Sequence, residues 1–395
     1  MLRLLLISVL LAGCTSAPPP PPGSMWGDVL IIAQAEQGAA PALWDDGQQL
    51  TAAWVGADDA GIHHDARQIS ADGALVPSLI LPLPPTRPHQ QTLLPASDGQ
   101  LHLTWIDANA AGENRLYSAL LNRDLSIERG PVEVSSAPTY AHAVLPAAGG
   151  GLWAAWSGGL LAEPILYLQA IDPAGRPLPP IELAADAHFP ALTAVSGAQL
   201  LFWISGDGQV MRARLADGVL LESAVITSAP YLDPSDRLDG MVAGADTSHA
   251  YLFWNITRAG STHETWFSAA AHADRGWSPP RPLTLVVNPD VVYQTGFDAP
   301  TAHSARLADT GGLSARWATP AMISSSALPV GLETDEGLAV VWFEAGEAAG
   351  YQRVIADVRL IGPPALLADA RDALTLAWSQ PHTDRPADLS LTSTR

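Results

Sequence analysis

The sequence predicts an all-β fold assembled from one repeated unit, and three observations support this prediction. First, an alternating apolar stretch recurs along the chain, and its copies end at Trp54, Trp105, Trp156, Trp203, Trp254, Trp342 and Trp378. Second, the first four steps between these tryptophans are 51, 51, 47 and 51 residues, and a fixed period in this range indicates a repeat fold. Third, 34 Pro and 33 Gly among 395 residues suit many short strands joined by turns.

Each tryptophan stretch has similar neighbours in the sequence. A short apolar strand and a turn precede it, as in Ala143 to Gly150, and a second alternating run follows it, as in Pro164 to Ile171. A further turn then leads to a closing strand such as Pro180 to Ala184. Four antiparallel strands in a unit of about 45 residues are typical of a β-propeller blade. The tryptophans are therefore expected to fill the spaces between blades.

We predict a seven-bladed β-propeller of four-stranded antiparallel blades. The last blade lacks a fourth strand, and Asp28 to Gln34, at the other end of the chain, matches the closing strands in length and alternation. We expect this N-terminal strand to complete the seventh blade, because a closed ring leaves fewer unpaired strand edges. The expected blades span residues 41–85, 89–136, 140–185, 188–229, 236–287, 326–368 and 369–395.

Residues 288–325 interrupt the repeat and widen the tryptophan spacing to 88 residues between Trp254 and Trp342. The stretch Gly311 to Trp317 faintly resembles the repeated motif, so a degenerate eighth blade is one alternative. We favour a long surface insertion, because the flanking strands of a blade are missing. Loops on a rigid scaffold often carry binding residues, and we predict that this one contacts a partner. The candidate contacts are of types enriched at interface centres, namely Tyr293, Phe297, Arg306, Arg316 and Trp317.

The first residues predict export and membrane anchoring. An apolar run, Leu4 to Leu11, is too short to span a bilayer. It leads into Leu-Ala-Gly-Cys ending at Cys14, which resembles the lipobox of bacterial lipoproteins. The resemblance implies that Cys14 is lipidated and becomes the mature N-terminus. The predicted organisation is a signal peptide over residues 1–13, the lipidated cysteine and a Pro-rich tether over residues 14–24, and one propeller domain over residues 25–395. The alternative is an ordinary secretory signal in which Cys14 falls by chance.

The predicted location is extracytoplasmic, with the anchor in the outer leaflet of the cell membrane or on the periplasmic face of the outer membrane. The predicted partners are membrane lipid, through the acylated Cys14, and either another protein or a glycan. Nucleic acid is not an expected partner, because 40 acidic residues against 20 arginines and no lysine give a net charge of −20. A single cysteine also excludes an intramolecular disulfide.

One turn resembles a motif of a known family. Ala273 to Thr284 (ADRGWSPPRPLT) resembles a worn Asp-box of the sialidase-like propellers, in which Ser-x-Asp-x-Gly-x-x-Trp forms the turn between the third and fourth strands. The matching residues are Asp274, Gly276 and Trp277. His272 stands at the Ser position, and the tryptophan comes two residues early. Ser70 to Gly73 in blade one is a weaker match. The resemblance covers turns only, so it implies the fold more than an activity.

Active sialidases use three arginines that clamp a substrate carboxylate, a Tyr–Glu nucleophile pair and an Asp acid/base. Such a clamp requires cationic forks near the propeller axis, which the first strand of each blade lines. The expected first strands span residues 41–47, 91–99, 141–150, 190–197, 241–248, 329–337 and 368–373. None of them contains Arg apart from Arg371 in the last. We therefore predict no sialoside hydrolysis. The leading prediction is a binding or scaffolding module, such as an accessory subunit of a membrane complex. The alternative is a sialidase-like glycoside hydrolase or a glycan-binding surface protein.

The sequence predicts no catalytic, cofactor-binding or metal-binding residue. Without lysine there is no P-loop cation and no Schiff-base nucleophile. A single cysteine excludes a thiolate metal site. His63-His64-Asp65 is the densest group of ligand-type side chains, but neighbouring residues on a strand point to opposite faces. We expect these three to be exposed polar residues on a third strand.

Overall fold

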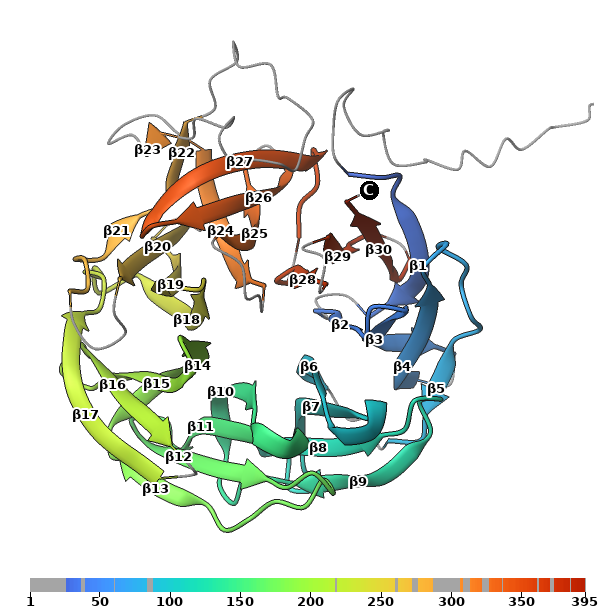
Figure 1. The fold of residues 1–395 in the computed structure, drawn as a ribbon, viewed down its shortest axis with the longest axis horizontal. Coiled ribbons are helices and arrows are strands. Elements are labelled where there is room, and N and C mark those ends of the chain that lie inside the picture. The colour runs from blue at the N-terminus through green and yellow to red at the C-terminus, as the bar shows by residue number, and fades with distance from the viewer. Residues whose placement is uncertain are drawn as a thin grey trace, which may run out of the picture.

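The computed structural model describes residues 26–36, 40–59, 61–83, 88–216, 219–259, 262–271, 276–286, 306–307, 313–321, 327–335, 337–360, 362–369, 373–383 and 385–394. These residues form seven antiparallel sheets arranged as a ring around a central axis (Figure 1). The regular structure is almost entirely β-strand, with two short 3-10 turns, η1 (Ser97–Gly99) and η2 (Ala148–Gly150). The protein is therefore a seven-bladed β-propeller, as the sequence predicts.

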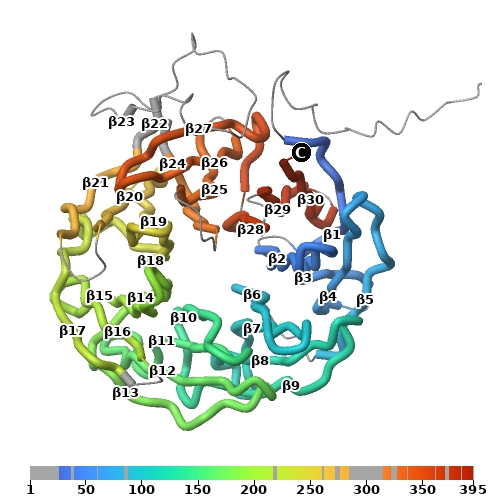
Figure 2. The backbone as a smooth tube through the Cα atoms, in the orientation of Figure 1, coloured from blue at the N-terminus to red at the C-terminus, as the bar shows by residue number. Residues whose placement is uncertain are grey.

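Four strands make up each blade, from the axis to the rim (Figure 2). Blades one to three contain β2 (Ala42–Asp45), β3 (Gln49–Asp58), β4 (Gly61–Ser70) and β5 (Leu79–Leu81); β6 (His89–Pro95), β7 (Leu101–Ala108), β8 (Asn114–Leu121) and β9 (Ile127–Glu133); and β10 (Thr139–Pro146), β11 (Leu152–Leu160), β12 (Glu163–Ile171) and β13 (Ile181–Ala184). Blades four and five contain β14 (Ala187–Val195), β15 (Ala198–Ser205), β16 (Gln209–Ala216) and β17 (Val219–Ser228); and β18 (Arg237–Ala245), β19 (Ala250–Thr257), β20 (His263–Ala270) and β21 (Arg281–Pro282). Blades six and seven contain β24 (Leu313–Pro320), β25 (Leu328–Thr334), β26 (Gly337–Glu344) and β27 (Glu347–Ala356); and β28 (Ala365–Ala368), β29 (Leu374–Gln380), β30 (Ala387–Ser393) and β1 (Leu30–Ala35).

The N-terminal strand closes the ring, as expected. β1 pairs with β30 in antiparallel register, from Leu30 opposite Leu391 to Ala35 opposite Ala387. The pairing extends beyond β1, because the Gly27 amide donates to the Ser393 carbonyl at 2.8 Å. The last blade is therefore built from both ends of the chain, and its outer edge is formed by the first strand.

Blade six differs from the expected boundaries. The expected surface insertion at residues 288–325 contains β24, which pairs with β25 on the side away from β26 and is the first strand of this blade. It also contains β23 (Arg306–Leu307), which pairs with β22 (Thr284–Val286) beside β24. The blade spans residues 313–356 rather than 326–368. Residues 365–368, expected to be its fourth strand, are instead β28, the first strand of blade seven.

The repeated motif explains this error. In six blades the tryptophan stretch forms the second strand. The copy that ends at Trp342 lies in β26 (Gly337–Glu344), which is the third strand of blade six. Strands two and three both alternate in apolar character and both lie between two neighbours. The alternation therefore does not reveal the position of a strand within its blade, which is decided by pairing with a distant segment.

Hydrophobic cores lie between neighbouring blades, as expected for the tryptophans. Six of the seven motif tryptophans are buried at these interfaces: Trp54, Trp105, Trp156, Trp203, Trp254 and Trp378. Trp342, which lies on a third strand, is only partly buried. The core between blades five and six uses Phe253, Phe267 and Phe343 instead, whose rings contact one another edge to face or stacked.

The two faces of the ring are defined by strand direction. We name the face at which the first strands begin the top face. Because the strands of a blade alternate in direction, the hairpins between second and third strands and the links from one blade to the next also lie there. The turns between first and second strands and between third and fourth strands lie on the bottom face. Within the described residues, no helix combines the length and apolar character needed to cross a bilayer.

Candidate binding site at the top of blades five and six

Five of the seven first strands are bulged where they begin, at the top of the axis. Register shifts occur in β6 (His89 to Thr92), β10 (Thr139 to Ala141), β14 (His188 to Ala191), β18 (Leu238 to Gly240) and β24 (Arg316 to Thr319). Three bulges hold an L-residue at positive φ, namely Gln90 (52°), Phe189 (50°) and Trp317 (61°). A positive φ is a real outlier for a bulky residue, and such strain and bulges gather at functional sites, where they redirect side chains. The top of the axis is therefore the first place to look for a site.

Arginine occurs on two first strands, and these belong to neighbouring blades. Arg237 begins β18 and Arg316 lies on β24. This corrects the expectation that no first strand outside the seventh carries Arg. The first strand expected for blade five begins at residue 241, so it excludes Arg237, and the expected insertion at residues 288–325 covers β24. We refer to the set formed by Arg237, Asp239, Thr257, His263, Arg316 and Trp317 as the blade five–six site.

A chain of polar contacts joins the blade-five members of the site. Arg237 Nε lies 2.6 Å from Asp239 Oδ1. The Thr257 hydroxyl donates to Asp239 Oδ2, and it lies 2.9 Å from His263 Nδ1. Since the hydroxyl proton is used by Asp239, Nδ1 of His263 acts as the donor to Thr257, which leaves Nε2 as the acceptor. The pKa of His263 is lowered by burial first and then by Arg316, so the imidazole is neutral near pH 7.

Blade six contributes a stacked pair. The guanidinium carbon of Arg316 lies 4.3 Å from the ring centroid of Trp317, a distance at which cation–π attraction is effective. Arg316 also approaches Glu333, with Nη1 3.4 Å from Oε2. The bulge is tied to blade five, because the Ala318 amide donates to Asn255 Oδ1 at 3.0 Å. The strained backbone of Trp317 is thus held in place by a contact between two blades.

Nearby carboxylates are paired with cations. Arg258 Nη1 lies 2.6 Å from Asp236 Oδ2, and its Nε lies 2.9 Å from Glu264 Oε2. Glu333 has a pKa raised by burial, but it is only 3% exposed and accepts a hydrogen bond from the Leu360 amide at 2.8 Å. A glycosidase acid needs a raised pKa and access to substrate. The geometry of this part of the described chain therefore suits recognition better than acid catalysis.

The predicted contact residues meet different outcomes. Arg316 and Trp317 lie in the blade five–six site, and Arg306 lies in β23, next to β22. Tyr293, Phe297 and Cys14 fall outside the described residues, so their roles stay predictions. Sequence reasoning missed Arg237, Asp239 and His263. The only local signal was the polar turn Asp233 to Asp236 directly before β18, which marks the link between two blades.

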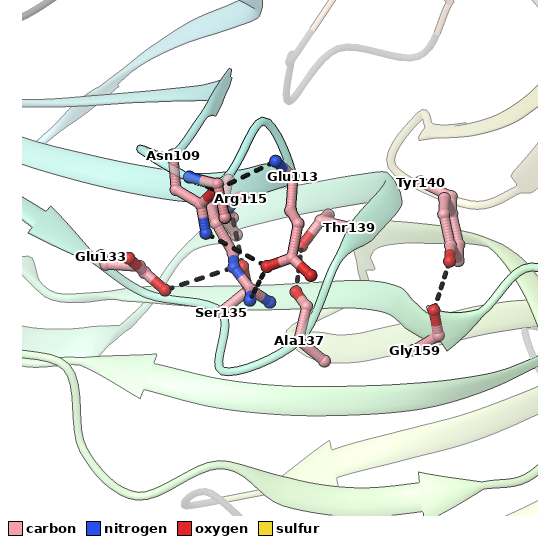
Figure 3. Close-up of polar contacts among 11 residues, drawn as sticks. Asn109, Glu113, Arg115, Glu133, Ser135, Ala137, Thr139, Tyr140 and Gly159 are labelled. Atoms are coloured by element: carbon pink, nitrogen blue, oxygen red, sulfur yellow. Dashed lines mark hydrogen bonds and ion pairs between the residues drawn. The ribbon is translucent and has the colours of Figure 1, made fainter.

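The top of blades two and three carries a second polar group, which Figure 3 shows. Arg115 Nη2 lies 2.6 Å from Glu113 Oε2, and its Nε lies 3.4 Å from Glu133 Oε1. The Tyr140 hydroxyl donates to the Gly159 carbonyl. These contacts join the β7–β8 hairpin to β9, and β10 to the β11–β12 hairpin. Arg115 is thus ion-paired within its own blade, and these contacts tie strands of one blade together.

The histidine pair occupies the third strand, β4, and its members face opposite sides, as expected. His63 Nδ1 lies 2.9 Å from Asp65 Oδ2, whereas His64 Nδ1 lies 2.6 Å from the Gln91 amide nitrogen in blade two. The expectation that all three residues are exposed is wrong, because His64 is fully buried against Trp105. Burial lowers the pKa of His64 to about 4. The described residues contain no group of His, Cys, Asp or Glu arranged to hold a metal ion.

Comparison with known proteins defines the class of protein by its fold. No protein-family model matches the chain, and no curated protein matches it. Among solved structures, the chain is similar to the polysaccharide lyase Uly1, with TM-score 0.53, 8% identity, and 91% of this chain and 90% of that chain covered. It is similar to a protein of unknown function from Dyadobacter fermentans, with TM-score 0.50, 8% identity and coverage of 94% and 99%. It is also similar to the α-L-arabinofuranosidase Arb93A from Fusarium graminearum, with TM-score 0.50, 12% identity and coverage of 78% and 93%. At these identities the likeness shows the propeller fold.

Proposed function

We propose that the protein is a membrane-anchored, extracytoplasmic propeller that binds a glycan at the blade five–six site. The observation that supports this most is the pair of bulged first strands that bring Arg237 and Asp239 from one blade beside Arg316 and Trp317 from the next. The likeness to propellers named as a polysaccharide lyase and an arabinofuranosidase is compatible with a glycan ligand.

The chemistry of the site suits a sugar that carries a carboxylate. Ligand sites combine an apolar surface with a few fixed polar groups. Trp317 offers an aromatic face, while Asp239 and the neutral His263 can exchange hydrogen bonds with hydroxyl groups. Arg237 is exposed, with 76% of its side chain accessible, and a guanidinium matches a carboxylate in two-point geometry.

Binding is expected to depend on Arg237 and on the ring of Trp317. We expect Arg237→Ala to weaken an acidic oligosaccharide about tenfold or more, because a charged hydrogen bond contributes ~1.5–3 kcal/mol. Trp317→Gly should weaken binding, because the aromatic ring is lost. The melting temperature should not decrease, because glycine adopts the positive φ at this position without strain. Titration calorimetry against acidic and neutral oligosaccharides measures both effects.

The matched control is Arg214→Ala. Arg214 is an exposed arginine on β16, the third strand of blade four, outside the site. Its removal changes the net charge as Arg237→Ala does and should leave affinity unchanged. Equal loss in both variants would show that overall charge, not the site, controls binding. Release of sialic acid from a fluorogenic sialoside, above a heat-treated sample, would show that the protein is an enzyme rather than a binding module.

The proposal of a membrane anchor is supported by the stretch that resembles a lipobox and by the Pro-rich segment after it. We propose that Cys14 is acylated and that Ala17 to Ser24 acts as an extended spacer, since polyproline spans about 3.1 Å per residue. β1 runs from the bottom to the top face, so the chain enters the ring from the bottom. An anchored propeller would thus present its top face, with the blade five–six site, away from the membrane.

The anchor is tested by metabolic labelling with a fatty acid. The wild-type chain should be labelled and should partition with membranes, because several acyl chains on one residue hold a protein firmly. Cys14→Ala should lose both properties while keeping the melting temperature of the propeller. Label of equal strength in the two proteins would refute acylation of Cys14.

A protein partner at the same face is the second candidate, as for an accessory subunit of a membrane complex. Leu160 and Leu161, at the tip of the β11–β12 hairpin, are 75% and 70% exposed, and Tyr231 before blade five is 75% exposed. All three lie on the top face, and exposed apolar groups mark interaction surfaces. Affinity purification from detergent-solubilised membranes separates the candidates. A defined protein recovered by wild type and lost in Leu160→Ser/Leu161→Ser supports the subunit.

A further inference from the structure

One arginine is buried at the junction of blades four and five, away from the blade five–six site. Arg212 lies in β16, the third strand of blade four, and only 4% of it is exposed. It is the only arginine that is buried in the described part of the chain. Charged side chains are almost never buried without a partner, because the charge loses its hydration. The surroundings of Arg212 should therefore show what compensates its charge.

Strand register places Arg212 on the face of blade four that meets blade five. Arg212 lies opposite Phe202 on β15, and Val210, two residues earlier on the same face, packs with Phe202 in the core between these blades. The ring of Phe202 contacts Trp277 of blade five edge to face, with centroids 5.5 Å apart. Trp277 belongs to the turn that resembles an Asp-box. We name Arg212, Phe202 and Trp277 the blade four–five seam.

The guanidinium of Arg212 has no ion pair, hydrogen bond or ring contact with any described residue. By contrast, Arg115 and Arg258 each lie 2.6 Å from a carboxylate oxygen. Nε of Arg212 is completely enclosed, whereas Nη1 and Nη2 retain contact with solvent. The side chain therefore presents only the end of its fork at the surface, with the N–H donors of its two terminal nitrogens unused.

The carboxylates of blade five on this side do not compensate the charge. Asp236 and Glu264 are both paired with Arg258, and Glu264 also accepts a hydrogen bond from Trp266, which packs in the core between blades four and five. At the rim the seam is bordered by β17, which has ten residues, and by β21, which has two (Figure 1). The outer strand of blade five is thus too short to cover the seam along the whole length of β17.

We infer that the blade four–five seam binds a small oxyanion, a carboxylate or a phosphate group, at Arg212. A planar guanidinium donates two parallel hydrogen bonds to such a group. Because Nε is enclosed, the anion is held end-on by Nη1 and Nη2. Its charge replaces the hydration that the guanidinium loses on burial. The inference is independent of glycan binding at the blade five–six site, which lies on the opposite side of blade five.

Thermal melting with inorganic phosphate, and separately with sodium acetate, tests this inference. Each probe is exchanged for sodium chloride at constant ionic strength, so that general screening is the same in all samples. A ligand that binds only the folded state raises the melting temperature, and we expect a rise of about 2 °C or more with at least one probe. Arg212→Met should abolish this rise. A response to phosphate alone identifies a phosphate group as the ligand, and a response to acetate identifies a carboxylate.

Arg214→Met is the matched control. Arg214 is exposed two residues further along the same strand, and its loss changes the net charge equally. This variant should keep the full rise in melting temperature. No rise in the wild type with either probe, or an equal rise in Arg212→Met, would overturn the inference, because any bound anion would then lie elsewhere, for example at Arg237.

A second variant decides the question if Arg212→Met does not fold. Arg212→Lys keeps the charge but has no planar fork, so it cannot hold an oxyanion by two parallel hydrogen bonds. Its melting temperature should rise less than that of the wild type with the same probe. A full rise in Arg212→Lys would overturn end-on binding by the guanidinium.

Discussion

Deleting residues 25–36 is expected to open the ring and cause aggregation. β1 is the outer strand of blade seven, so its loss exposes the full edge of β30 and removes an N-terminal segment that fills two interfaces. Trp26 packs between blades six and seven, and Ile32 packs between blades seven and one. Unpaired edges of this length are templates for association with other chains. Light scattering after size exclusion, together with thermal melting, measures the effect.

Two neighbouring isoleucines provide a sharper version of this test. Ile32 is 1% exposed, whereas Ile31 is 49% exposed on the same strand. Ile32→Ala should lower the free energy of unfolding by ~2–5 kcal/mol, because it leaves a cavity between blades. Ile31→Ala should change it by less than about 0.5 kcal/mol, since it only removes exposed surface.

The deletion of residues 25–36 has a clear opposing outcome. A truncated protein that stays monomeric and melts like the wild type would show that β1 does not close the ring.

Replacing Trp156 by alanine is expected to destabilise the propeller by ~3–5 kcal/mol. The side chain is fully buried between blades two and three, and its ring stacks on Tyr167 with centroids 5.4 Å apart. Removing it takes away both the buried apolar area and the stacking contact. Chemical denaturation followed by tryptophan fluorescence and circular dichroism measures the loss.

The same change at Trp342 is the control that distinguishes sequence motif from structural position. Trp342 ends the same type of motif, but it lies on the third strand of blade six and is only partly buried. Trp342→Ala should therefore cost only about 1 kcal/mol, near the average for single substitutions. Equal losses at Trp156 and Trp342 would mean that the motif fixes the role of the residue and that the assignment of β26 as a third strand is wrong.

The sequence by itself determined the architecture. A period of about 50 residues, strands that alternate in apolar character and one incomplete terminal blade were enough to predict seven blades and their closure by the N-terminal strand. The reason is that blades are local units. Each unit must bury both faces of its sheet, so the same pattern of apolar residues and turns recurs wherever a blade forms.

Only the tertiary structure decided the composition of blade six and the candidate site. Its first strand, β24, is separated from β22 by residues in which the repeat is lost, and its position depends on pairing with β25 and on the contact between Ala318 and Asn255 of blade five. Arg237 and Arg316 are 79 residues apart in the sequence, and no local pattern relates them. They meet at the top of the axis because two bulged strands of neighbouring blades begin there, an arrangement set by strand pairing and packing between blades rather than by the order of residues along either strand.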